Sequence, residues 1–487
     1  MERLPRYSRA HLSLGQDFFD PVAPAEFPSH KLRYRNDTAA GSVGLAHLND
    51  AQWVSHFAKF TSLDPLAQPA PLALRYHGHQ FQQYNPDLGD GRGFLFAQLY
   101  DLDDGRLLDL GTKGSGTTPY SRSGDGRLTL KGAVREALAT GFLELLGVNT
   151  SKTLSVIETG EQLFRNDEPS PTRSAVLVRL SHSHIRFGTF QRLSFEGKTE
   201  AVAQLIDHCF KYYFSDISEN QIQQSTALSF LNAVVSQKAK TVAQWMAAGF
   251  VHGVLNTDNM NITGESFDYG PYRFLPYYDP GFTAAYFDHA GLYAFGRQPS
   301  AVLWNLRQLA GTLTPFADHT ALIDILQGYG PKLESEIAYA VFRRFGVQAP
   351  VTEDNCLDLK RANEILTVFY QAMRKTSCQY QAPFFDLYGG GTEQLKLAQT
   401  GPRSQYYQNH TLAAALAPIV DLPSSDTARK FQRRLDDDVP DLRLPEIEAI
   451  WNSIAQGDDW RAFQNTLNSF ELAPLAPLAP LAPNVTE

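Results

Sequence analysis

The sequence predicts an α+β protein with two lobes, because strand patterns and long helical patterns occupy different parts of the chain. Short apolar runs typical of strands are concentrated before residue 190, with one strong helical pattern among them. From Lys198 onward long helical patterns dominate, and such segregation is typical of α+β proteins. We therefore expect an N-terminal extension and strand-rich lobe over 1–190 and a helical lobe over 191–423. Residues 424–487 should form C-terminal helices and a proline-rich tail.

Composition places the chain among ordinary globular proteins and excludes several functional classes. The 487 residues are 43% hydrophobic and 20% charged, with a net charge of −9. No long basic stripe occurs, so we expect no nucleic-acid partner. The first fifteen residues have no apolar core of a secretory signal, and no apolar run approaches the roughly 18–20 residues of a membrane span. Cys209, Cys356 and Cys378 are widely spaced and form no CxxC, which predicts a cytoplasmic protein without a disulfide framework.

The strand-rich part begins with a helix and a hairpin. Residues 47–60 have a helical pattern, with Asn49 or Asp50 as the N-cap. The apolar runs Gly93–Tyr100 and Leu107–Leu110 flank an Asp-Asp-Gly sequence. Because Asp-Gly favours the turns that match strand twist, these two runs predict a β-hairpin.

One strong helix and three strands should complete this part. Lys131–Leu146 is rich in Ala, Leu and Glu and ends at Gly147, which predicts a helix. Strands are predicted at Thr153–Glu158, Ser174–Leu180 and His184–Phe190.

The second part of the chain is predicted to be mainly helical. Its helical patterns cover 198–214, 219–249, 299–313, 318–345 and 359–375. Two more helices are expected within 424–470, and residues 472–483 then repeat Leu-Ala-Pro. A proline at every third position excludes a helix and favours polyproline II.

A polar stretch over 249–279 carries the strongest chemical signal of the helical part. Asp258 and Asn259 are adjacent, and nine residues later comes Asp268, followed by Tyr-Gly. Oxygen donors of this kind suit Mg²⁺, which protein kinases hold with the Asp of Asp-Phe-Gly and an Asn of the catalytic loop. The alternative is that these residues cluster only because they form turns.

The densest polar stretch is Asp109–Arg127, DLGTKGSGTTPYSRSGDGR. It matches neither the P-loop pattern nor the dinucleotide fingerprint. Its glycines allow backbone N–H groups to approach an anion, and Lys113 supplies a positive charge. Glu136 on the following helix is a candidate partner for Lys113, as in kinases. The alternatives are a flexible loop tip and a solvated surface glutamate.

Two arginines and two histidines follow within a short segment. Arg179 and Arg186 lie at the ends of predicted strands, and arginine suits bidentate contact with phosphate. Ordinary surface arginines are the alternative. His182 and His184 are spaced like metal ligands but no third ligand accompanies them, and the same holds for the His-Gly-His at 77–79. We therefore expect no metal at either histidine pair.

The residues around His252 depart from the usual kinase pattern. Phosphotransferases of the kinase superfamily often have His-Gly-Asp, with an Asn five residues after that Asp. Here Val254 follows His252-Gly253, and Asn259 comes five residues later. The usual catalytic base is therefore missing, and a carboxylate stands instead at Asp258.

Several long motifs together resemble the SelO family, also called YdiU. They are GDGR at 89–92, TKGSGTTPYSRSGDGR at 112–127, REAL at 135–138, RFGTF at 186–190 and GFVHGVLNTDNMNITGESFDYGP at 249–271. The resemblance extends from about residue 30 to about residue 380. It implies a protein-kinase-like fold and a protein adenylyltransferase. In that family the nucleotide binds flipped relative to kinases, so that AMP passes from ATP to a protein hydroxyl.

The resemblance also implies roles for individual residues. The residues it places on ATP are Gly89, Gly91, Arg92, Lys113, Asp125, Gly126, Arg179, Arg186 and Asp268. Glu136 is the ion-pair partner of Lys113, and Asp258 is the proton acceptor. Asn259 and Asp268 are the ligands of Mg²⁺, or of Mn²⁺ in its place.

The chain also departs from the family pattern. Eukaryotic members carry a selenocysteine or cysteine near the C-terminus, whereas the last cysteine here is Cys378. Residues 405–416 retain Asn409 and His410 but otherwise diverge. Two alternatives stay open: a nucleotide-binding pseudokinase scaffold, favoured by Val254, and UMP transfer from UTP with Mn²⁺. The same valine disfavours an ordinary kinase.

Overall fold

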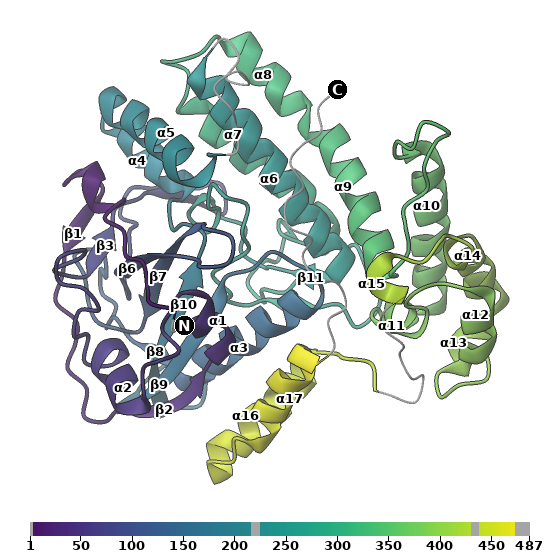
Figure 1. Ribbon diagram of the computed structural model, residues 1–487, viewed down its shortest axis with the longest axis horizontal. Coiled ribbons are helices and arrows are strands. Elements are labelled where there is room, and N and C mark those ends of the chain that lie inside the picture. The colour runs from purple at the N-terminus through teal and green to yellow at the C-terminus, as the bar shows by residue number, and fades with distance from the viewer. Residues whose placement is uncertain (1–2, 216–224, 430–437, 473–487) are drawn as a thin grey trace.

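The computed structural model describes residues 3–215, 225–429 and 438–472 (Figure 1). It shows the expected α+β architecture with two lobes: a curled antiparallel sheet, at the left of Figure 1, and a larger helical part beside it. The predicted Leu-Ala-Pro tail lies outside the described residues, apart from its first position. No helix among the described residues has the length and apolar character needed to cross a membrane.

The N-terminal lobe is built on one sheet of eight strands. Their order is β1-β3-β6-β7-β10-β9-β2, and β8 pairs with β10. The strands are β1 (Phe19–Pro21), β2 (Lys31–Arg35), β3 (Leu72–Leu74), β6 (Leu95–Tyr100), β7 (Leu107–Lys113), β8 (Leu128–Thr129), β9 (Lys152–Leu163) and β10 (Thr172–Ser181). Strands β6 and β7 form the predicted hairpin, and β9 and β10 contain the predicted strands at 153–158 and 174–180.

Three helices accompany the sheet: α1 (Asp37–Ser42), α2 (Asp50–Phe57) and α3 (Leu130–Leu145). Helix α2 begins at the predicted N-cap Asn49, whose side chain accepts a hydrogen bond from the Gln52 backbone N–H at 3.0 Å. Thr129 caps α3 in the same way. Both predicted helices of this lobe are confirmed.

The strand predicted at His184–Phe190 is wrong. The chain leaves the sheet at Ser181 and forms helix α4 (Phe187–Phe195), with Arg186 as its N-cap. Phe187 and Phe190 are both fully buried and stand three residues apart, which is a helical spacing. Arg186 therefore lies at a helix start rather than at a strand end.

The helical part contains most of the predicted helices. It comprises α5 (Thr199–Tyr213), α6 (Thr226–Ala248), α7 (Gln298–Gly311), α8 (His319–Gln327), α9 (Tyr329–Arg344), α10 (Leu359–Thr376), α11 (Ala382–Asp386), α12 (Thr392–Ala398), α13 (Ser404–Tyr407), α14 (His410–Val420) and α15 (Asp426–Arg429). The start predicted for α6, at 219, falls outside the described residues. The single helix predicted at 318–345 is two helices that meet at Gly328. Pro331 lies in the first turn of α9, where a backbone N–H would have no acceptor within the helix, so proline is tolerated there.

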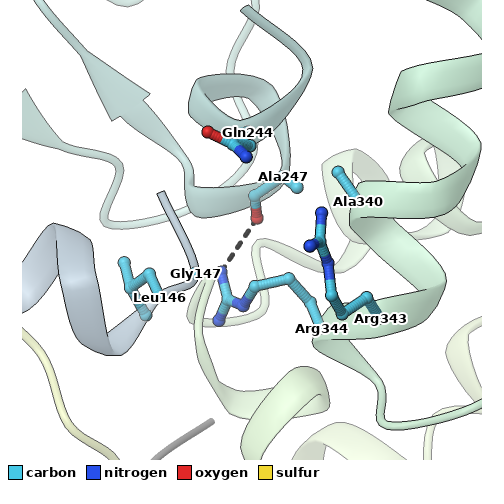
Figure 2. A pocket seen from close by; sticks show the side chains of 7 residues that line it. All are labelled: Leu146, Gly147, Gln244, Ala247, Ala340, Arg343 and Arg344. Carbon is cyan, nitrogen blue, oxygen red and sulfur yellow. Dashed lines mark hydrogen bonds between the residues drawn. The ribbon is translucent and has the colours of Figure 1, made fainter. Parts of the chain in front are cut away.

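Side chains from neighbouring elements fix the C-terminal end of α6. Arg344 of α9 donates to the Ala247 carbonyl at 2.9 Å (Figure 2). Tyr380 and Gln381 donate to the adjoining carbonyls at 2.7 and 2.9 Å. Gly249 then ends the helix in a left-handed conformation with φ 65°. These bonds set the position from which the chain enters β11 (Phe250–Val251) and the polar stretch after it.

The last two helices return to the N-terminal lobe. Helices α16 (Leu444–Gly457) and α17 (Arg461–Leu472) pack against α3, below the sheet in Figure 1. The rings of Phe470 and Phe142 lie 5.1 Å apart in this contact. Between the two helices Asp458 accepts hydrogen bonds from Arg33 and Arg173, each at 2.8 Å. The two helices predicted within 424–470 are thus present, with the short α15 before them.

Candidate functional site

Strands β7 and β10 present Asp109, Lys113 and Arg179 on the face turned toward the helical part. Leu108 and Leu110 of β7 lie in a smaller core that covers the other face of the sheet. Because side chains alternate along a strand, the intervening positions Asp109, Gly111 and Lys113 share the opposite face. Arg179 of β10 stands directly across from Gly111.

Lys113 lies between two carboxylates. Its Nζ is 2.6 Å from Glu136 Oε2 and 2.5 Å from Asp268 Oδ1. The side chains of Lys113 and Glu136 are only 8% and 3% exposed. Glu136 is therefore not a solvated surface residue; it faces the sheet from α3 and holds the lysine beside Asp268.

Three cations surround Asp268. Arg179 Nη1 lies 3.5 Å from Glu136 Oε1 and 3.6 Å from Asp268 Oδ1, and Arg186 Nη1 lies 3.6 Å from Asp268 Oδ2. Burial alone would raise the pKa of Asp268, but Lys113, Arg179 and Arg186 hold it well below its usual value. Asp268 is therefore ionised and available as an oxygen ligand.

The backbone around Asp268 is held in an unusual conformation. Asp268 has φ 69°, in the left-handed region that non-glycine residues rarely adopt. The preceding carbonyl, of Phe267, lies 3.1 Å from His252 Nε2, and Trp245 Nε1 donates to Ser266 at 2.9 Å. Conformations held in this way by surrounding contacts are common at functional sites.

Asp258 lies in the 3₁₀ helix η3 (Thr257–Asn259) and is 9% exposed. Its Oδ1 is buried without a hydrogen-bond partner among the described residues. Burial raises the pKa of Asp258 to about 6, although Arg186 acts in the opposite direction. Arg186 Nη1 also donates to the Asp258 carbonyl at 2.9 Å. The guanidinium of Arg186 lies between the rings of Tyr76 and Phe267, at 4.4 and 5.1 Å.

The adjacent Asn259 is oriented by the loop itself. Its Nδ2 donates to the Val254 carbonyl at 3.0 Å, so its Oδ1 is the atom available to a cation. Within the described residues no three His, Cys, Asp or Glu side chains form a group able to hold a metal. A cation between Asn259 and Asp268 would need further oxygens from elsewhere, as Mg²⁺ bound to phosphates does. The Oδ1 of Asn259 and the ionised carboxylate of Asp268 fit such an ion.

The hairpin of β4 (Gly78–Gln80) and β5 (Gln83–Asn85) supports this loop, a contact that sequence reasoning missed. The His79 backbone N–H donates to Thr257 Oγ1 at 2.7 Å, and Thr257 Oγ1 donates to Gln191 Oε1 at 2.6 Å. A Cβ at Gly78 would lie 3.1 Å from Asp258 Oδ1. The His-Gly-His sequence at 77–79 was the local signal for this hairpin, and His79 Nδ1 lies 2.7 Å from Gln191 Nε2.

The two glycine-rich segments pack against each other beside the cluster. A Cβ at Gly89 would lie 2.3 Å from the Tyr120 ring, and Ser121 Oγ donates to the Gly91 carbonyl at 2.5 Å. The predicted Arg92 is exposed. Asp90, between the two glycines, was not predicted, yet its Oδ1 lies 3.3 Å from Arg186 Nη2.

The structure does not bring Asp125 and Gly126 into the charged cluster. Asp125 is exposed and lies 2.9 Å from Arg165; among the described residues no ion pair or hydrogen bond joins it to Lys113 or Asp268. Gly126 has φ 68°, and a Cβ there would lie 2.3 Å from the Gly116 carbonyl. Gly126 thus allows the two sides of the loop to approach each other closely.

Comparison with known proteins assigns the family. The model of the family described as protein adenylyltransferase SelO matches residues 4–471. The chain belongs to the SelO family. The match extends beyond residues 30–380, the range over which the motifs resemble the family, and includes α16 and nearly all of α17.

Curated relatives agree with this assignment. The protein nucleotidyltransferase YdiU of Synechocystis sp. is 43% identical over 481 residues, covering 96% of this chain and 98% of that protein. YdiU of Trichodesmium erythraeum is 43% identical over 478 residues, covering 95% and 97%. YdiU of Vibrio cholerae is 37% identical over 341 residues, covering 70% and 68%. The chain is accordingly an enzyme of the nucleotidyltransferase class.

At the centre of this SelO-family site, two arginine side chains have hydrogen-bond donors without an acceptor among the described residues. Arg179 Nη1 and Arg186 Nε are buried without a hydrogen-bond partner among the described residues. Buried polar groups in native proteins are nearly always paired, and arginine pairs well with phosphate. The unfilled donors therefore suit the phosphates of a nucleotide.

Proposed function

We propose that this chain transfers AMP from ATP to Ser, Thr or Tyr hydroxyls of proteins and releases pyrophosphate. The observation that carries the proposal is the buried group of three cations around Asp268, with Asp258 on the adjoining loop. The family description, protein adenylyltransferase, supports the choice of nucleotide and acceptor class.

Lys113, Arg179 and Arg186 would bind the phosphate oxygens. Fixed cations in a water-poor site stabilise the charge that develops during phosphoryl or nucleotidyl transfer. Glu136 keeps Lys113 in place by its 2.6 Å ion pair. Gly89, Gly91 and Arg92 in one loop, and Asp125 and Gly126 in the next, remain proposed nucleotide contacts; the former loop adjoins Arg186 through Asp90.

Asn259 and Asp268 would hold the divalent cation, Mg²⁺ or Mn²⁺. When bound, such an ion neutralises phosphate charge and orients the phosphates for in-line attack. The oxygen donors present, one amide and one ionised carboxylate, fit a hard cation that takes its remaining ligands from phosphate and water.

Asp258 would accept the proton of the attacking hydroxyl. The hydroxyl oxygen forms a bond to the α-phosphorus, and the bond from that phosphorus to the bridging oxygen breaks, so pyrophosphate leaves with the electron pair. Asp258 Oδ1 is buried and unpaired among the described residues, so it is free to take the proton.

Paired label transfer tests the reaction. With ATP labelled at the α-phosphate, the purified chain should label protein, and with ATP labelled at the γ-phosphate it should not. Asp258→Ala and Asp268→Ala should both abolish the α-label. Transfer of the γ-label instead would make the chain a kinase and refute the proposal.

A pseudokinase scaffold is the second candidate, because Val254 occupies the usual position of the kinase base. It predicts that ATP raises the thermal unfolding temperature while no label is transferred from any position of the nucleotide. Replacing ATP and Mg²⁺ by UTP and Mn²⁺ in the same assay tests UMP transfer. We also propose a cytoplasmic location, since all three cysteines are free and Cys356 is exposed.

A further inference from the structure

Arg179, His184 and Asp109 form a buried chain of polar contacts beside the charged cluster, and neither His184 nor Asp109 has a part in the proposed function. Arg179 Nε donates to His184 Nε2 at 3.1 Å. His184 Nδ1 faces Asp109 Oδ2 at 3.4 Å. Asp109 is fully buried, and His184 and Arg179 are each 4% exposed. In the sequence, His184 and His182 are spaced like metal ligands but have no third ligand beside them.

The bond from Arg179 determines the tautomer of His184. An arginine Nε always carries hydrogen and only donates, so His184 Nε2 must present its lone pair. The ring proton is then on Nδ1, facing Asp109. The Asp109 carboxylate also accepts from the His184 backbone N–H at 2.6 Å and from Gln98 Nε2 at 2.7 Å.

The same bond orients the guanidinium of Arg179. With Nε committed to His184, Nη1 is turned toward Glu136 and Asp268, at 3.5 and 3.6 Å. These distances are longer than hydrogen bonds, so Nη1 remains an unfilled donor aimed into the site. We propose that Asp109 and His184 are positioning residues that hold Arg179 with this edge toward the phosphates. The inference rests on the proposed function for the ligand that Arg179 meets.

Gly111 supports the same arrangement by leaving room for the ring. A Cβ at Gly111 would lie 2.8 Å from His184 Cε1 and 3.0 Å from its Nε2. Gly111 is also the strand partner of Arg179. Gly111→Ala would therefore displace the His184 ring without altering Arg179, Asp109 or any charge.

A double-mutant cycle tests the proposal. Asp109→Asn replaces the carboxylate that faces His184 Nδ1 by an amide, and should lower the rate of AMP transfer by about 10- to 100-fold, the usual cost of losing a residue that orients a ligand-binding group. In an Arg179→Lys background the same change should have an effect within about threefold, because the two residues act as one unit. Gly111→Ala should behave like Asp109→Asn in both backgrounds.

His182→Asn is the matched control. His182 lies two residues from His184, and its ring contacts Tyr213 rather than the Arg179 chain, with centroids 5.6 Å apart. It should leave transfer within about twofold, as most changes outside a functional site do. Equal losses for Asp109→Asn with and without Arg179 would overturn the proposal, because they would show a role in folding alone.

A measurement on the unaltered protein needs neither activity nor a variant that folds. Nitrogen-15 NMR of labelled histidines, with His184 assigned through its bonds to the labelled backbone, should show a proton on Nδ1 and none on Nε2. A proton on Nε2 would refute the proposal even if Asp109→Asn does not fold. If the chain transfers no AMP, the cycle is repeated on ATP affinity by calorimetry, which separates failure of this inference from failure of the proposed reaction.

Discussion

Replacing Glu136 by glutamine removes one charge from the centre of the site and changes almost nothing in shape. In the native protein Glu136 Oε2 lies 2.6 Å from Lys113 Nζ, and Oε1 lies 3.5 Å from Arg179 Nη1. Deleting one partner of a buried ion pair ordinarily costs about 3–5 kcal/mol. Here Lys113 keeps Asp268 at 2.5 Å, and the glutamine oxygen can still accept a hydrogen bond. We therefore expect a loss of unfolding free energy of about 1–3 kcal/mol.

The same substitution should also impair the reaction. Without the charge of Glu136, Lys113 and Arg179 are drawn more strongly to Asp268, the proposed metal ligand. We expect AMP transfer to fall by about 10- to 100-fold, measured with ATP labelled at the α-phosphate beside unfolding in urea.

Glu144→Gln on the same helix is the matched control. Glu144 lies two turns further along α3, is 50% exposed and pairs with Lys152. Exposed ion pairs contribute little, so this change should cost less than about 1 kcal/mol and leave transfer unaffected. If the two variants behave alike in stability and in transfer, Glu136 does not hold Lys113 in the way we describe.

Three further outcomes are expected. Asp258→Asn should lower AMP transfer by about 100-fold or more while ATP still binds by calorimetry; undiminished transfer would exclude Asp258 as the proton acceptor. Burial lowers the pKa of Lys238 to about 7, below the unfolded value of about 10.4. Between these pKa values the unfolded chain binds one more proton than the folded chain, so the free energy of unfolding should rise with pH. Urea unfolding at about pH 7 and about pH 9 should show a smaller rise for Lys238→Met than for the native chain. An equal rise in the two proteins would contradict this expectation. Asp458→Asn removes the negative charge that Arg33 and Arg173 share and replaces one acceptor oxygen by an NH₂ group. It should speed proteolysis of α16 and α17, and a digestion pattern equal to that of the native chain would count against the contact.

Patterns within a short stretch of sequence predicted correctly those elements that depend on neighbouring residues alone. The Asp-Asp-Gly hairpin, the Asn49 cap and the helix that carries Glu136 all follow from residues close together in the chain. Local patterns failed at 184–190, where apolar residues were read as a strand although Phe187 and Phe190 bury at helical spacing in α4.

Patterns of this kind could not predict contacts between residues that are far apart in the chain. Asp90 meets Arg186 across 96 residues, and the β4–β5 hairpin supports Thr257 across 178. Nothing near Asp90 in the sequence indicates which cation it faces, because that depends on how the loop before β6 packs over α4.

The sequence by itself determined the division into two lobes, the hairpin that contains Asp109, and the family motifs; the structure showed that its second strand continues to Lys113. Only the tertiary structure decided that Lys113, Arg179 and Arg186 converge on Asp268, and that His184 orients Arg179. The reason is physical: periodicity specifies which face a side chain occupies, whereas the neighbour across that face depends on strand register and on helix packing between segments far apart in the chain.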